Sequence, residues 1–284
     1  MNQSSQARKD PSKGFVTVAT QKKQFLAGAQ NLAESILDYY EDARITLFTE
    51  QHFIDDPSMH AYFTPFEHIL PTPGDHKREK MYGMANTPYD LTFYMDADIQ
   101  IDHEDIVSVF DQLEGGRYDM AYVNLTKEGA KHFAEWNWGP NLYDDGWEGI
   151  PDHLAHCGGV ALYDTRNPLV REFMSDWYTL YLKQESREWD PPEFDYIKTG
   201  GFRQWDQLTL WWLIYHSPKY KSLKWKFFEE NYRWNYFTSF GFNKDGTHNC
   251  HIVDPNRDYW KTNPDPVVIH FSSWMDKDGD KGFL

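Results

Sequence analysis

The first hundred residues alternate between short apolar runs typical of strands and apolar stripes with the period of a helix. Short β-rich runs predict strands at 14–20, 43–50 and 91–99. Between them, apolar residues recur every three or four positions over 24–40, and the segment 75–89, charged at its start, is expected to be helical. Strands that alternate with helices predict an α/β fold with a mostly parallel sheet.

The second half of the chain is less regular, but its local patterns still predict two strands and two helices. Long loops rich in Trp, Gly, Pro and Asp lie between them, and long loops in a compact domain are often functional. The predicted strands are 158–164 and 266–271, the helices are 168–183 and 206–216, and the loops are 129–156 and 184–204.

In the stretch LTFYMDADIQI, residues 91–101, the apolar run of a predicted strand leads to two acids separated by a single alanine. Alternate strand residues point to the same side, so Asp96 and Asp98 are expected to face one site, where a divalent cation would offset their repulsion. Three interpretations are open. The acids could cap a turn, or act as nucleophile and acid of a haloacid-dehalogenase-like phosphatase, or hold a metal that grips a nucleotide diphosphate. The phosphatase family places its acids after the first strand and follows them with Gly or Thr, unlike this chain.

Composition disfavours several classes of protein. The 284 residues carry 28 basic and 44 acidic side chains, a net charge of −16, which disfavours a nucleic-acid surface and an anionic membrane surface. Two cysteines are too few for a disulfide framework or a cysteine zinc site. Aromatic residues make up 17% of the chain, which suits both a packed core and the stacking of sugar rings.

The N-terminal segment 1–13 is polar and is expected to be a disordered tail, since it offers nothing to bury. It lacks the apolar segment of a signal peptide. The chain also has no run of about 18 apolar residues that could span a membrane. We therefore expect a cytoplasmic protein with no membrane span.

The residues around the acidic pair occur in an informative order. KMYGMANTPYDLTFYMDAD begins with Lys80; Tyr89 follows nine positions later, and Asp96 and Asp98 then end the strand. This stretch resembles the signature of glycosyltransferase family 8 and related GT-A enzymes, the glycogenin and galactosyltransferase type. The opening segment VTVATQKKQFLAGAQNLAESI is similar to the family's first strand, nucleotide loop and helix start, with Phe25 in place of the usual Tyr.

Three later segments resemble the family in the same order along the chain. HCGGVALYD is similar to its Asn-Ser-Gly-Val strand, with Cys157 and Gly158 in the places of Asn and Ser. Trp205-Asp206-Gln207 is similar to the Asp-Gln pair beside the donor sugar, and VVIHFSSW to the closing strand that supplies a third metal ligand, here His270. The family's closing lysine has no direct match, and Lys277 is the nearest candidate.

The resemblance implies an α/β GT-A fold, a Rossmann-like mixed sheet flanked by helices in a single domain over 14–284. Segment 14–101 would bind the nucleotide sugar, and 102–284 would bind the acceptor and complete the metal site. The implied activity is that of a hexosyl- or pentosyltransferase (EC 2.4), moving a sugar from a nucleotide diphosphate sugar, expected to be a UDP-sugar, to a hydroxyl acceptor with retention. The implied metal is Mn²⁺ or Mg²⁺, with Asp96, Asp98 and His270 as ligands. The implied nucleotide-sugar residues are Ala19, Thr20, Phe25, Lys80, Asp96, Gly158, Gly159 and Lys277, and the implied catalytic residues are Asp206 and Gln207.

The insert 134–156 combines tryptophans with carboxylates, the usual means of stacking a sugar and binding its hydroxyls. It is a candidate site for a glycan or other hydroxyl acceptor, although a Trp-packed surface loop would have the same composition. The candidate acceptor residues are Trp136, Trp138, Asp144, Asp145 and Trp147.

Simpler roles exist for the main candidates: Lys80 could be a solvated helix lysine, His270 a core histidine, and Asp206 a helix cap. Two other classes of protein also stay open. One is a non-catalytic sugar- or cation-binding protein that keeps the GT-A fold. The other is a viral-type transferase acting on modified DNA bases, which the charge of −16 disfavours.

Overall fold

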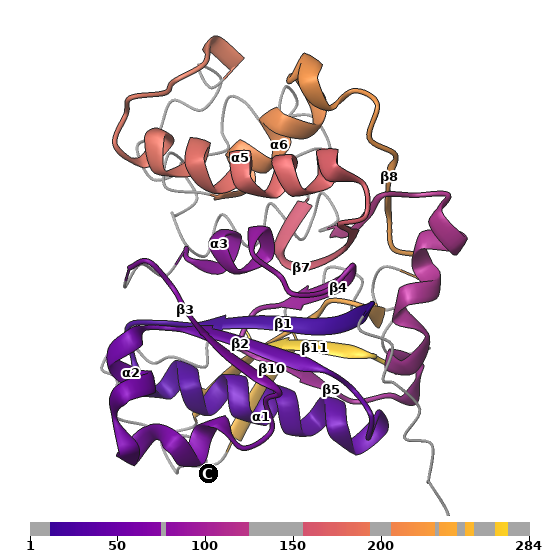
Figure 1. Cartoon of the computed structure of the whole chain (residues 1–284). Helices are drawn as coiled ribbons and strands as arrows, with labels where there is room; N and C mark the ends of the chain where they lie inside the picture. Colours follow the sequence, from indigo (N-terminus) through magenta and orange to yellow (C-terminus); the bar gives the residue numbers. More distant parts are fainter. Residues whose placement is uncertain are drawn as a thin grey trace, which may run out of the picture.

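A mixed seven-stranded sheet forms the centre of the molecule, in the order β3-β2-β1-β4-β7-β6-β8 (Figure 1). The structure is a computed structural model, and it describes residues 12–74, 78–124, 156–193, 206–230, 233–242, 248–252 and 265–271. Strands β1 to β4 run parallel, whereas β7 is antiparallel to both β4 and β6. The strands are β1 (Lys13–Ala19), β2 (Ile45–Thr49), β3 (His68–Pro71), β4 (Leu91–Met95), β6 (Met120–Asn124), β7 (His156–Asp164) and β8 (Trp225–Phe227).

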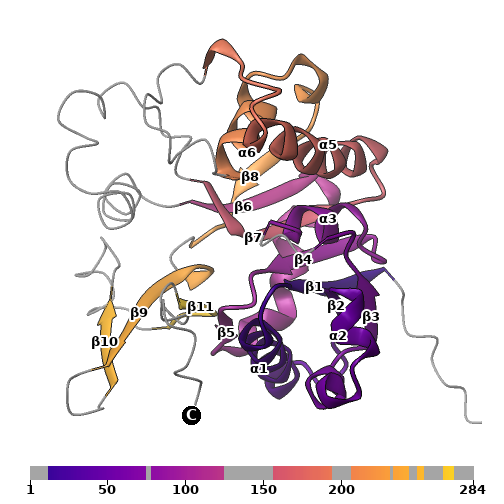
Figure 2. The same cartoon turned by 90° about the vertical axis from the view of Figure 1, so that its left-hand side faces the viewer.

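A second sheet of four strands, in the order β10-β9-β11-β5, lies beside the first (Figure 2). It joins β5, close to the acidic pair, to strands from the C-terminal part of the chain. β11 pairs antiparallel with β5 and parallel with β9. Its strands are β5 (Ile99–Ile101), β9 (Tyr236–Phe242), β10 (His248–Ile252) and β11 (Val268–Phe271).

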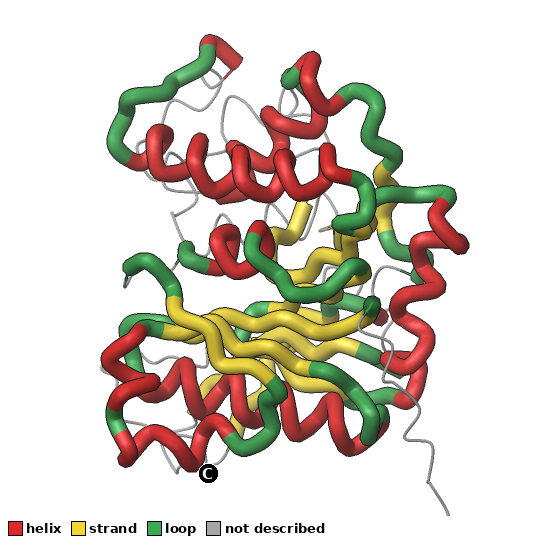
Figure 3. The backbone as a smooth tube through the Cα atoms, in the orientation of Figure 1, coloured by secondary structure: helices red, strands yellow, loops and turns green. Residues whose placement is uncertain are grey.

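Helices cover both faces of the central sheet (Figure 3). α1 packs on one face, and α3, α5 and α6 pack on the other. No helix among the described residues combines the length and apolar character that crossing a membrane requires. The α-helices are α1 (Lys23–Tyr39), α2 (Gln51–Asp55), α3 (Lys80–Ala85), α5 (Pro168–Glu185) and α6 (Asp206–Tyr215). The 3₁₀ helices, labelled η, are η1 (Pro57–Phe63), η2 (Glu104–Gly116) and η8 (Pro218–Tyr220).

The apolar stripes seen in the sequence form the two cores on either side of the sheet. One core contains the buried stripe of α1, and the other contains that of α5. β1 contributes to both, because Phe15 points into the first core and Val16 into the second. This burial of both faces is typical of parallel strands inside an α/β fold. The stripe of α1 is Leu26, Ala29, Leu32, Ala33 and Ile36, and that of α5 is Val170, Phe173, Met174, Trp177 and Tyr181.

The structure corrects several predicted boundaries. β1 already begins at Lys13, inside the segment expected to be disordered, and residues 1–11 lie outside the described part. β4 is the fourth strand of the chain and not the third, because the half-buried β3 at 68–71 precedes it. β4 ends at Met95 and β5 begins at Ile99, so the acidic pair lies in a turn between two strands and strand alternation does not apply to it.

Candidate functional site

A possible metal site lies where the two sheets meet. Asp96 and Asp98 come from the β4–β5 turn and His270 from β11, and each offers a ligand atom within 4.8 Å of the other two. The sheet register explains this meeting, because β11 places His270 opposite Ile99, next to Asp98. His270 Nε2 lies 3.1 Å from Asp98 Oδ1. Two carboxylates and one imidazole form a mixed oxygen and nitrogen set that suits a divalent cation.

The imidazole of His270 is oriented by Asn235, which the sequence did not single out. Nδ1 of His270 lies 3.0 Å from Oδ1 of Asn235, and both side chains are buried. An amide oxygen can only accept, so Nδ1 carries the proton and Nε2 faces Asp98. Metal-binding histidines are commonly fixed in this way by a hydrogen bond to their second nitrogen.

Tyr94 and Lys80 hold the first carboxylate of the turn. The Tyr94 hydroxyl donates to Asp96 Oδ1 at 2.5 Å, and Lys80 Nζ lies 3.4 Å from Asp96 Oδ2. Burial raises the pKa of Tyr94 well above its usual value, so its hydroxyl remains a donor. Burial also raises the pKa of Asp98, but the protonated form of His270, through its charge and its hydrogen bond, and the charge of Lys80 outweigh that effect, so the net shift is downward. Asp98 is therefore ionised near neutral pH.

Two adjacent glycines of β7 pass close to these side chains. A Cβ added at Gly159 would lie 2.7 Å from Asp96 Oδ2 and 2.8 Å from His270 Cε1. A Cβ at Gly158 would lie 2.7 Å from Asp206 Oδ2. All three distances are shorter than those that real Cβ atoms show. The backbone of β7 therefore passes close to both carboxylate clusters, at positions where an added side chain would force their groups to shift.

The second cluster is centred on Asp206, the first residue of α6. Its carboxylate is buried, with Arg78 Nη1 3.0 Å from Oδ1 and Lys80 Nζ 3.0 Å from Oδ2. Burial favours a raised pKa, but the two cations outweigh it and lower the pKa of Asp206 to about 2. The backbone carbonyl of Asp206 also accepts a hydrogen bond from Trp177 Nε1 at 2.8 Å.

Gln207 follows Asp206 on α6, and its Oε1 is buried without a hydrogen-bond partner among the described residues. A buried polar atom of this kind is costly unless a ligand completes it.

At the carboxyl end of β1, Ala19 and Thr20 are buried. Phe25, in the first turn of α1, packs against the core on that face of the sheet. The Thr49 hydroxyl donates to the carbonyl of Ala19 at 2.6 Å and ties this end to β2. Gln21 adopts a φ of 74°, an unusual backbone conformation for a residue other than glycine. Its N–H donates to the carboxylate of Glu50 at 3.0 Å, which fixes the loop after β1.

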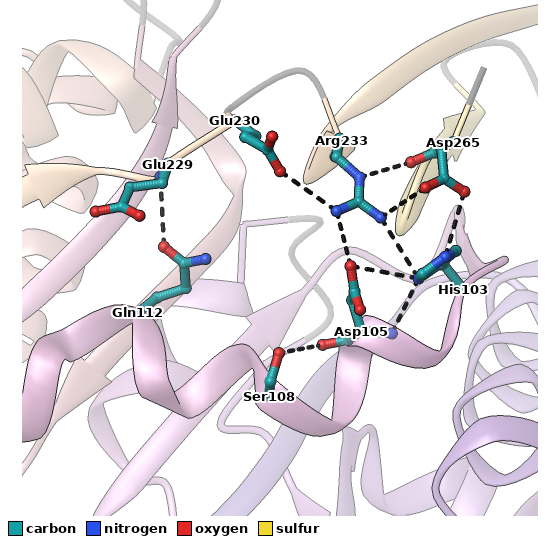
Figure 4. Close-up of polar contacts among 8 residues, drawn as sticks. All are labelled: His103, Asp105, Ser108, Gln112, Glu229, Glu230, Arg233 and Asp265. Atoms are coloured by element: carbon teal, nitrogen blue, oxygen red, sulfur yellow. Dashed lines mark hydrogen bonds and ion pairs between the residues drawn. The ribbon is translucent and has the colours of Figure 1, made fainter. Parts of the chain in front are cut away.

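An ion-pair cluster joins segments that flank the second sheet (Figure 4). Arg233 Nη1 lies 2.7 Å from Asp105 at the start of η2, and Nη2 lies 3.0 Å from Asp265, which precedes β11. His103 also approaches Asp265, at 3.3 Å. These contacts attach the segments carrying Asn235 and His270 to the chain that follows the acidic turn.

The structure thus brings together Lys80, Asp96, Asp98, Gly158, Gly159, Asp206 and His270. The candidates Trp136, Trp138, Asp144, Asp145, Trp147 and Lys277 lie outside the described residues. Sequence reasoning missed Arg78, Tyr94 and Asn235. Tyr94 could have been found, since it lies two residues before Asp96 in the same apolar run; the other two carry no local signal.

No protein-family profile and no curated protein matches the sequence. Among solved structures, WbbM, a bifunctional glycosyltransferase, overlays with a TM-score of 0.52 and 12% identity, over 95% of this chain and 48% of that one. GlyE, a glycosyltransferase of Streptococcus pneumoniae TIGR4, overlays with a TM-score of 0.51 and 13% identity, over 96% and 57%. This chain therefore spans about half the length of those proteins.

A galactosyltransferase, LgtC, solved with donor and acceptor sugar analogues, overlays less well, with a TM-score of 0.46 and 12% identity over 93% of this chain and 90% of that one. At that score the overlay adds nothing to the assignment. The first two likenesses establish the GT-A fold, as the sequence predicted. Identities this low establish nothing beyond the fold.

Proposed function

We propose that this chain is a metal-dependent glycosyltransferase (EC 2.4) that moves a sugar from a UDP-sugar to a hydroxyl acceptor with retention of configuration. The supporting observation is the bridge formed by Lys80, which lies 3.4 Å from Asp96 and 3.0 Å from Asp206. It links a set of metal-type ligands to the buried carboxylate of Asp206, which Gln207 follows on α6. A nucleotide sugar needs a metal ion next to its diphosphate and hydrogen-bonding groups next to its sugar, and the diphosphate and the sugar are joined directly to each other.

On the diphosphate side, Asp96, Asp98 and Nε2 of His270 are the proposed ligands of Mn²⁺ or Mg²⁺, which fits their donor chemistry and their separation. When bound, such an ion neutralises negative charge that builds up on the diphosphate. Lys80 adds a point charge to the phosphate oxygens. Lys277 is proposed as a further phosphate contact, and the end of β1, with Ala19, Thr20 and Phe25, as the nucleoside side.

On the sugar side, Asp206 accepts hydrogen bonds from sugar hydroxyls, and Gln207 steadies the positive charge that develops at the anomeric carbon. Gln cannot act as a base, so the departing phosphate oxygen takes the proton of the acceptor hydroxyl. Attack then occurs on the face from which the phosphate leaves, which retains the configuration. The acceptor itself is proposed to bind the insert 134–156, through the aromatic and acidic residues named from the sequence.

A panel of nucleotide sugars tests this function, with hydrolysis of each donor followed in Mn²⁺ and in EDTA. We expect UDP-sugar hydrolysis that EDTA abolishes. Gln207→Ala should lower kcat while donor KM stays near normal, because the contact matters most in the transition state. Gln30→Ala is the matched control, since Gln30 is bonded to Glu34 on α1 away from the site.

Two results would contradict the proposal. Donor binding without turnover of any nucleotide sugar or acceptor would indicate a non-catalytic binding protein. A β-linked product from an α-linked donor, read from the anomeric proton by NMR, would overturn retention and direct the search to a base opposite the leaving group.

A further inference from the structure

Asp206 has more positive charge around it than one carboxylate needs. Arg78 contacts one of its oxygens and Lys80 the other, each at 3.0 Å. The side chain of Asp206 is only 3% exposed, so neither cation is replaced by solvent. One cation suffices to neutralise a buried carboxylate, and the presence of a second calls for an explanation.

The two cations are held differently. Lys80 lies between two carboxylates, Asp206 and Asp96, and its compact ammonium can turn toward either. Arg78 makes its carboxylate contact with one guanidinium nitrogen and is also hydrogen-bonded to Tyr181 of α5. Arg78 is therefore fixed by two elements, whereas Lys80 is shared.

Donor binding should act on these cations unequally. In the proposed function, which this inference assumes, the diphosphate recruits Lys80, and Asp206 then loses one of its two counter-ions. A buried carboxylate left with none is strongly destabilised and either takes up a proton or moves. Either change would remove the acceptor oxygens that the sugar hydroxyls need.

We propose that Arg78 is the permanent counter-ion of Asp206, a positioning residue that keeps this carboxylate ionised and in place while Lys80 is drawn to the substrate's phosphates. Arg78 then affects nucleotide binding without touching the nucleotide. Its effect passes through Asp206, and it disappears when Asp206 no longer needs a counter-ion.

A binding cycle tests this route. The dissociation constant of UDP in the presence of MnCl₂ is measured by calorimetry for the wild type, Arg78→Met, Asp206→Asn and the double variant. We expect Arg78→Met to weaken UDP binding about tenfold, because Lys80 is then needed by Asp206. In the Asp206→Asn background the same change should have less than a twofold effect, because a neutral amide needs no cation.

Two further variants separate this role from a general loss of structure. Arg78→Lys, which keeps the charge, should restore UDP binding to within about threefold of the wild type. Arg166→Met, which removes an arginine paired with Asp164 outside the site, should leave UDP binding unchanged. An equal loss of UDP binding on Arg78→Met in the wild-type and Asp206→Asn backgrounds would overturn the proposal, and so would no effect of Arg78→Met in either.

A measurement without nucleotide keeps the two proposals distinguishable. Lys80→Met imitates the recruitment of Lys80, and urea midpoints are compared for Lys80→Met, Arg78→Met, both together, and both with Asp206→Asn. We expect a loss in the double variant clearly greater than the sum of the single losses, with recovery when Asp206→Asn is added. Absence of UDP binding in the wild type would contradict the proposed function, whereas additive urea midpoints would overturn the counter-ion role itself.

Discussion

The two acidic clusters that share Lys80 have opposite charge balances. Asp96 and Asp98 face an imidazole whose Nδ1–H is directed to Asn235, so their charge is offset only in part. Asp206 is a single carboxylate with two cations at 3.0 Å. The difference shows which parts of a site the protein completes itself. The first cluster needs charge from outside, and the second is already neutralised and can supply directed acceptors.

The largest expected effect is on the incomplete cluster. Asp98→Asn removes a charged ligand where negative charge develops, so sugar transfer should fall by at least about 100-fold. Steady-state kinetics over a range of Mn²⁺ concentrations measures this loss. The control is Asp102→Asn, an exposed carboxylate just after β5, which should behave as the wild type. Full activity of Asp98→Asn, or of the wild type in EDTA, would show that the turn binds no catalytic metal.

The neighbouring glycines allow each cluster to be disturbed separately. Gly159→Ala places a methyl group against Asp96 and His270, and Gly158→Ala places one against Asp206. We expect Gly159→Ala to weaken Mn²⁺ binding about tenfold to 100-fold, because the ligands must shift, and Gly158→Ala to leave Mn²⁺ binding nearly unchanged. Calorimetric titration with Mn²⁺ compares the two variants, and equal losses in both would show that the clusters are not separate.

Removal of the histidine's support should have a smaller effect. Asn235→Ala leaves Nδ1 of His270 without its acceptor, and Mn²⁺ affinity should fall about tenfold because the ring is no longer fixed. Asn235→Asp still offers an oxygen to the same N–H and should restore most of the affinity. Unchanged Mn²⁺ affinity in Asn235→Ala would show that β11 alone orients the ring.

The smallest expected effect is the loss of stability at low pH that arises from Asp206. The pKa of Asp206 is about 2 in the folded protein, below its ordinary value of 3.8. The ionised carboxylate therefore stabilises the fold fully above pH 3.8, and this stabilisation is lost as the pH falls toward 2. Between pH 5 and pH 3 this contributes about 1 kcal/mol to the decline in the free energy of unfolding. The free energy of unfolding, measured with urea, should therefore fall by about 1 kcal/mol less between pH 5 and pH 3 in Asp206→Asn than in the wild type. Equal slopes would contradict the assignment, and Asp102→Asn is again the control.

The sequence predicted the parallel half of the fold well, because its strands and helices have distinct apolar periods. The stripe of α1 and the run of β4 are both evident in isolation. β3 was missed because its four residues are only half-buried and carry no alternation. The acidic turn was taken for a continuing strand, since nothing local marks the point where β4 ends and β5 begins.

The site was predicted where its residues belong to contiguous motifs, and it was missed where pairing depends on distant strands. Asn235 and Arg78 act through partners far away in sequence. Those partners become visible only when β11 pairs with β9 and when α3 and α6 both pack against α5. His270 was identified only through the family resemblance. A single histidine near a strand end carries no signal of its own.

The pairing of β11 with β5 also sets an order of events during synthesis. A ribosome releases Asp96 and Asp98 long before it releases His270, so the parallel strands β1 to β4 can form while the third ligand is still untranslated. During that interval Lys80 is the positive charge closest in sequence to the acidic turn. The set of metal-type ligands is therefore complete only once the C-terminal strands have arrived.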